Sequence, residues 1–126
     1  MMKQDLDLIR EILLLVEKHD DGTGHSIGAS NFDDFRNLAK ANILYGHLKI
    51  LKERGFLEEN SSYGSGGYFQ ISTNRLTAIG HDYLESVRDP KIWRETKEGL
   101  AKVGGSTTLA LVQALAVSVT HKVLGL

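Results

Sequence analysis

The sequence predicts a mainly α-helical protein that carries one small β-hairpin. Three observations lead to this fold class. Apolar residues recur at three- and four-residue spacing in several segments, which is typical of amphipathic helices. Two short apolar runs flank a stretch of asparagine, serine and glycine, which is typical of a hairpin. A single proline among the 126 residues leaves these helical segments uninterrupted.

The composition is that of an ordinary globular domain, with 41% hydrophobic and 25% charged residues and a net charge of −1. The absence of cysteine excludes a disulfide framework, a thiolate metal site and a cysteine nucleophile. Acidic residues stand near the start of the chain, where a signal peptide would have a basic region. We therefore expect a cytoplasmic protein.

Three helices are predicted in the first half of the chain. The first covers about residues 5–19, where one face carries Leu6, Ile9, Leu13 and Val16. The second is short, covers residues 32–39, and is capped by Ser30 or Asn31. The third covers residues 41–54 and ends at a glycine that suits the left-handed C′ position. A short link between the second and third helices is typical of a helix-turn-helix.

The third helix has two sides of different character. One side carries a core stripe of Leu44, Leu48 and Leu51. The opposite side carries Asn42, Tyr45, Gly46, Lys49 and Lys52. Residues 40–56 contain four basic residues and one acidic residue, although the whole chain is slightly acidic. This local excess of positive charge makes the segment the candidate for contact with a polyanion.

The hairpin is predicted to follow the third helix, with strands at residues 56–59 and 68–71 around a loop at residues 60–67. Helix, helix and hairpin in this order, after a leading helix, form a winged helix-turn-helix. The loop does not fit a P-loop, because it contains no lysine and a strand follows it instead of a helix.

Three further helices are predicted beyond the hairpin. Thr77 caps a helix that continues to Val87, Asp89-Pro90 opens the next helix, and Ser106 caps a last helix that continues to about Leu124. We expect a winged helix-turn-helix domain at residues 1–88 and a C-terminal helical extension at residues 89–126. The last helix is too short and too interrupted to span a bilayer, which requires about 20 apolar residues.

The last helix is strongly apolar, so the extension is expected to pack on the domain or to form a homodimer interface. Through the third helix, the domain is expected to bind double-stranded DNA in the major groove, which is about 12 Å wide. The predicted DNA-binding residues on the helix are Lys40, Asn42, Tyr45, Gly46, Lys49 and Lys52, and those on the loop are Ser61, Ser62 and Tyr63.

An enzyme is not expected. The five histidines have no metal-ligand spacing, and no Ser/His/Asp arrangement or apolar carboxylate pair is present. Neither a metal nor a cofactor is therefore expected. The alternative to a DNA-binding protein is a non-enzymatic adaptor that binds protein through the acidic first helix or the last helix of the same scaffold.

Four blocks of the sequence, in this order, resemble a bacterial and phage-associated family known as domain of unknown function 2513: MKQDLDLIREILLLVE, YGHLKILKERGFLE, RLTAIGHDYLESVRD and IWRETKEGL. The second block is also similar to the recognition helix of ArsR- and MarR-like regulators. Thr77 to His81 is similar to the Leu-Thr-x-x-Gly element after the wing of those proteins. By this likeness, the groove-facing positions are Asn42, Tyr45, Gly46 and Lys49. The resemblance implies a winged-helix fold and a phage or prophage setting, in which we expect a transcriptional regulator.

Overall fold

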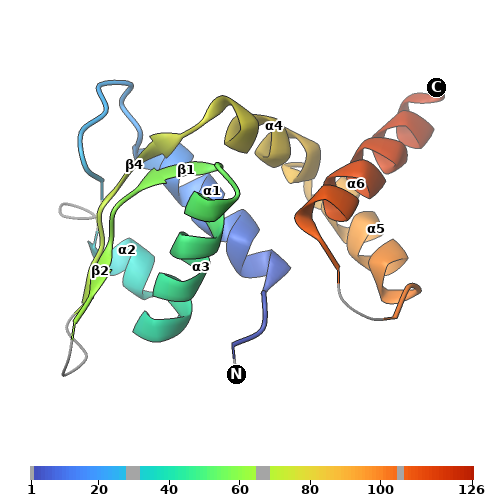
Figure 1. Ribbon diagram of the computed structural model, residues 1–126. Helices are drawn as coiled ribbons and strands as arrows, with labels where there is room; N and C mark the ends of the chain where they lie inside the picture. Colours follow the sequence, from blue (N-terminus) through green and yellow to red (C-terminus); the bar gives the residue numbers. More distant parts are fainter. Residues whose placement is uncertain (1, 28–31, 65–68, 105–106) are drawn as a thin grey trace. The chain divides into compact units, whose positions relative to one another are not determined.

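The computed structural model describes residues 2–27, 32–64, 69–104 and 107–126. These residues form six helices and two small antiparallel sheets (Figure 1), so the predicted mainly helical class with a hairpin is confirmed. The chain divides into two compact units, residues 1–81 and 82–126, and each is described here by itself. The division falls within helix α4 (Ala78–Val87), whereas the sequence predicts a boundary after residue 88.

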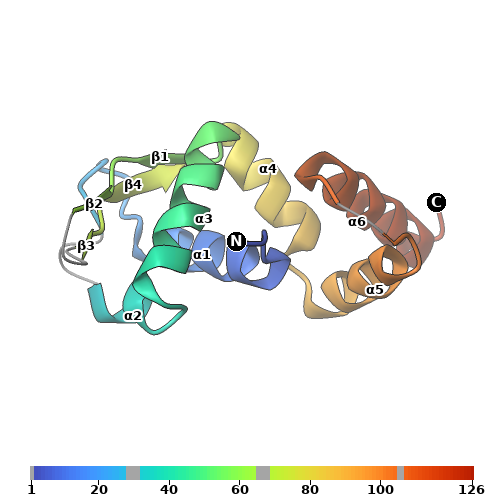
Figure 2. The ribbon, with the colours of Figure 1, turned by 60° about the horizontal axis from the view of Figure 1, so that its bottom comes forward.

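The first unit is built on helix α1 (Leu6–His19), helix α2 (Phe32–Arg36) and helix α3 (Ala41–Glu53). Helix α1 begins after Asp5, whose carboxylate accepts the amide hydrogen of Leu8 in an N-cap. Helices α1 and α3 pack together (Figure 2) and share a core of fully buried side chains: Ile9, Ile12, Leu13, Val16, Leu44, Leu48 and Leu51. The predicted helix bounds therefore hold closely for both. The predicted caps of α2, Ser30 and Asn31, lie outside the described residues.

The hairpin is longer than the sequence predicts. Strand β1 (Leu57–Glu59) pairs with β4 (Thr73–Leu76), and strand β2 (Ser62–Tyr63) pairs with β3 (Phe69–Gln70). The expected pairing of residues 56–59 with 68–71 is therefore wrong, and part of the expected loop is strand. The polar segment before Leu76 was not recognisable as a strand, although Thr73 and Leu76 both point into the core. The tip at residues 65–68 lies outside the described residues.

The second unit contains helix α5 (Pro90–Ala101) and helix α6 (Leu109–Leu124), which pack on each other. Asp89 caps α5 as predicted, and its carboxylate accepts the amide hydrogens of Lys91 and Ile92. The hydroxyl of Thr108 caps α6 instead of Ser106, which lies outside the described residues. Along α6, Leu109, Val112 and Ala116 are buried, whereas Val123 near the end of the helix is 50% exposed.

Helix α6 also exposes other large apolar side chains. They are Leu111, Val117 and Leu124, and Leu126 follows just beyond the helix. The helix is only weakly amphipathic, because it carries few charged residues to form a polar face. None of the helices in the described ranges is long and apolar enough to cross a membrane.

Gly80 allows the start of α4 to lie close to the backbone of Phe56, between α3 and β1. The side-chain oxygen of Thr77 accepts the Gly80 amide hydrogen at 3.0 Å, as the predicted cap requires. A Cβ atom at residue 80 would overlap the backbone carbonyl of Phe56. A backbone carbonyl cannot move aside as the end of a flexible side chain can.

Gly80→Ala is therefore expected to lower the free energy of unfolding by about 1–3 kcal/mol, because the added methyl group forces a backbone shift. Urea unfolding followed by circular dichroism measures the change. Gly104→Ala is the matched control, because a Cβ there meets no atom within 4 Å. Equal stability of the Gly80→Ala variant and the wild type would contradict the close approach.

Candidate nucleic-acid interface

Helix α3 is fixed in rotation by its buried side. Leu44, Leu48 and Leu51 are fully buried, so the predicted core stripe is confirmed. The helix ends where Gly55 adopts a φ of 75°, a left-handed conformation that glycine adopts at little cost. The opposite side of the helix, where DNA contact is predicted, therefore has a defined position relative to the hairpin.

His47 ties α3 to the start of α1. Its Nδ1 lies 2.8 Å from the carbonyl oxygen of Ile43, and its Nε2 lies 2.8 Å from the amide nitrogen of Asp5. A carbonyl only accepts and an amide only donates, so Nδ1 carries the proton and Nε2 accepts. With this arrangement of protons the ring is neutral. It is also fully buried, so His47 has a hydrogen-bonded packing role.

An aromatic cluster holds the hairpin against the first half of α3. The ring centroid of Tyr45 lies 5.5 Å from that of Tyr63 on β2 and 5.9 Å from that of Phe69 on β3. Tyr63 and Phe69 are themselves 5.9 Å apart, and Phe69 is buried. Tyr45 is half-buried in this cluster, so much of its ring packs on the hairpin instead of facing solvent.

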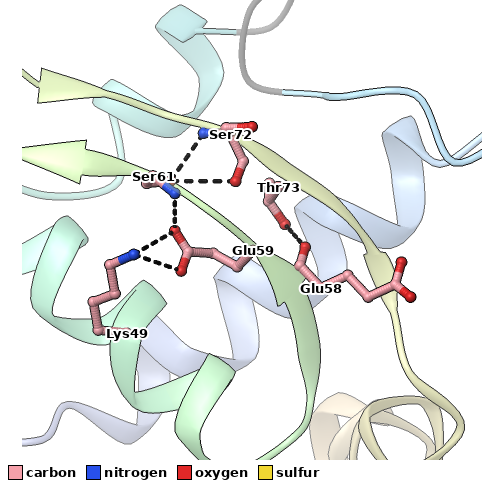
Figure 3. A network of polar contacts seen from close by, with 6 residues as sticks. All are labelled: Lys49, Glu58, Glu59, Ser61, Ser72 and Thr73. Atoms are coloured by element: carbon pink, nitrogen blue, oxygen red, sulfur yellow. Dashed lines mark hydrogen bonds and ion pairs between the residues drawn. The ribbon is translucent and has the colours of Figure 1, made fainter.

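One turn further along α3, Lys49 reaches the hairpin through a buried acid (Figure 3). Its Nζ lies 3.1 Å from Oε2 and 3.5 Å from Oε1 of Glu59, on β1. The Glu59 side chain is 0% exposed and that of Lys49 is 27% exposed. The ammonium also lies 5.2 Å from the Tyr45 ring centroid, within cation–π range. Lys49 is therefore engaged inside the protein, in contrast to the open position that its spacing predicts.

The same carboxylate organises the middle of the hairpin. The Ser61 amide donates to Oε1 of Glu59. The Ser61 hydroxyl accepts the Ser72 amide hydrogen at 2.9 Å and lies 3.5 Å from the Ser72 carbonyl, across the hairpin. Ser61 is buried as a result. A shift of strand register between Glu58 and Glu59 marks this irregular part of the hairpin, which links the β1–β4 pair to the β2–β3 pair.

The remaining predicted residues differ in exposure. Lys40, Asn42 and Lys52 are exposed on α3 or at its start, and Ser62 and Tyr63 are exposed on β2. Gly46 is half-buried, and a Cβ there would overlap the thioether of Met2. The structure thus separates the predicted set by exposure. The buried or half-buried residues are Tyr45, Gly46, Lys49 and Ser61.

Two residues relevant to this surface were missing from the sequence-based set. Arg54 is exposed at the end of α3. Glu59 and Leu57 are two residues apart on β1, so their side chains lie on the same face of the strand, and both are buried. The two-residue spacing from Leu57 could have indicated an inward-pointing carboxylate. An acidic residue in a short strand is, however, ordinarily expected on the solvent side.

Within the four described ranges, no three histidine, aspartate or glutamate side chains come together in a group that could hold a metal ion.

Comparison with known proteins is informative at the level of the family. The model of a family described as "Hypothetical protein (DUF2513)" matches residues 3–106. The chain belongs to the DUF2513 family. An uncharacterized protein of Haemophilus influenzae (strain ATCC 51907 / DSM 11121 / KW20 / Rd) is 26% identical over 123 residues, which cover 98% of this chain and 99% of that protein. The DUF2513 match ends before α6, whereas similarity to the relative covers almost the whole chain. No solved structure matches.

Replacement of the buried histidine tests the link between α1 and α3. His47→Leu leaves the Asp5 amide and the Ile43 carbonyl without their imidazole partner, so we expect a loss of about 1–3 kcal/mol of unfolding free energy. We also expect faster hydrogen exchange at the Asp5 amide, measured by NMR. His81→Leu is the control, because His81 is exposed on α4. An unchanged Asp5 exchange rate would contradict the link.

Proposed function

We propose that residues 1–81 form a winged helix-turn-helix module that binds double-stranded DNA, with α3 in the major groove. The order of elements supports this proposal, since α2 and α3 are followed directly by the hairpin. So does the anchoring of α3, whose buried leucines leave another side of the helix for a ligand. Membership of a family with the predicted helix-turn-helix blocks is consistent with a transcriptional regulator in a phage or prophage.

The observation that carries the proposal is the group of cations around α3. Lys40 precedes the helix, Lys52 lies in its last turn, and Arg54 follows it. All three side chains are exposed, and none has a hydrogen-bond or ion-pair partner among the residues that the structure describes. Within residues 40–54 the acid is Glu53, which is also exposed. Three cations and one anion leave a positive excess where a phosphate backbone can approach.

The dimensions of α3 suit a groove. Lys40 and Lys52 are twelve residues apart, which corresponds to about 18 Å along a helix axis. A major groove is about 12 Å wide, so cations at both ends of the helix can reach the phosphates that border it. Asn42 is exposed near the start of α3, and its side-chain amide suits bidentate contact with adenine. In this arrangement Lys40, Lys52 and Arg54 neutralise phosphates, and Asn42 contacts a base.

Salt titration of DNA binding tests the proposal. Fluorescence anisotropy with a short labelled duplex of mixed sequence is expected to show an affinity that falls steeply between about 50 and 200 mM salt. Lys52→Gln is expected to reduce the slope of log K against log salt by about 0.9, since one phosphate contact is lost. Lys91→Gln, an exposed lysine of the second unit, is the control. Undetectable binding by the wild type would reject the proposal and favour the protein-binding adaptor.

The exposed apolar side chains of α6 favour a protein contact in addition. We propose that this helix pairs with its counterpart in a second copy, because two-fold dimers are the commonest assembly of soluble proteins.

Disruption of this contact is measurable by sedimentation. Leu124→Glu is expected to reduce the mass in solution from twice the chain mass to the 13.9 kDa of one chain, because a charge in an apolar interface is costly. Ser118→Glu, at an exposed polar position of the same helix, is the control. A wild-type protein that sediments as a monomer would reject the dimer.

A further inference from the structure

The polar network between α3 and the hairpin contains a carboxylate that is fully enclosed. The Glu59 side chain is 0% exposed, and its Oε1 accepts the amide hydrogen of Ser61. Its Oε2 has no hydrogen-bond donor among the described residues, and the Lys49 ammonium at 3.1 Å is its ionic partner. A buried charge of this kind is tolerated only when an opposite charge compensates it.

The two partners come from different elements. Lys49 lies on α3, and Glu59 lies at the end of β1, where the strand register shifts. The pair therefore connects the helix to the middle of the hairpin, whereas Tyr45 connects the helix to β2 and β3. These two side-chain connections add to the backbone hydrogen bond from Phe56 to Leu51, and together they hold the hairpin against α3.

We infer that Glu59 is a positioning residue of the DNA-binding surface, which holds the hairpin beside α3 through Lys49 and withholds this lysine from phosphate. The part of this inference that concerns DNA rests on the proposed function. Lys49 then differs in role from Lys40 and Lys52, although all three lysines belong to the same predicted contact set. Their surroundings separate them, since only Lys49 has an anionic partner among the described residues.

The positioning role is tested without DNA, by urea unfolding of the full chain. Lys49→Met leaves the buried carboxylate without a cation, so we expect the urea midpoint to fall by at least about 1 M. Lys49→Met/Glu59→Gln removes the charge as well and keeps an acceptor for Ser61, so at least half of the loss should be recovered. Lys52→Met, at an exposed position of the same helix, is the control.

The urea midpoints of the two variants decide whether the Lys49–Glu59 charge pair holds the hairpin. Recovery of stability or of folding in the double variant supports the charge pair, even if Lys49→Met does not fold. A Lys49→Met midpoint equal to that of the control would overturn the inference. A double variant as unstable as Lys49→Met would overturn it too, because the unpaired carboxylate would then not be the cause.

The DNA-binding part is tested with the same labelled duplex. Glu59→Gln keeps a carbonyl for the Ser61 amide but removes the anion, so Lys49 becomes available to phosphate. We expect a salt slope steeper by about 0.9, because one more phosphate is neutralised. Lys49→Met/Glu59→Gln should return the slope to that of the wild type. A structural role alone would leave all these slopes equal.

The two proposals fail in different ways. If the wild type binds DNA and Glu59→Gln does not steepen the slope, Lys49 is not withheld from phosphate and that part of the inference is overturned. If the wild type does not bind DNA, the proposed function is rejected, while the urea experiment still decides whether Glu59 positions the hairpin.

Discussion

Helix α3 is held on two sides at once, and the candidate surface depends on this constraint. Its leucines are buried against the core of the first unit, and its Tyr45 and Lys49 side chains contact the hairpin. Each contact restricts the rotation of the helix in its own way: apolar burial fixes which side faces inward, and the ion pair fixes which side faces the strands. What remains exposed is a limited set of side chains, with Asn42 and Lys52 among them.

The helices could be predicted from local sequence because their ends carry local signals. Asp5, Thr77 and Asp89 each accept amide hydrogens of the helix that follows, and such caps act within three residues of sequence. The strands were harder to predict because each has only two to four residues and no clear alternation. Their pairing depends on a contact between Leu57 and Leu76, nineteen positions apart, which no local pattern encodes.

The candidate site could be predicted only in part, because local periodicity shows which residues share a side of a helix but not what packs on that side. Periodicity correctly separated the buried leucines of α3 from its other side. It could not show that the hairpin folds back on that other side, since Lys49 and Glu59 lie ten residues apart in different elements. Net charge was misleading in a similar way. The positive excess of residues 40–56 includes a lysine whose charge is compensated within the fold, so the excess that a ligand meets is smaller than the sequence suggests.

The buried pair between α3 and β1 also has an evolutionary consequence. A family member that loses the acid at position 59 retains an uncompensated cation, and one that loses the lysine at position 49 retains an enclosed anion. The intermediate without the lysine is penalised by its enclosed, unpaired charge, so loss of the lysine is expected to accompany or follow loss of the acid in diverging lineages. Correlated variation between these columns of a DUF2513 alignment would record that coupling, independently of any ligand.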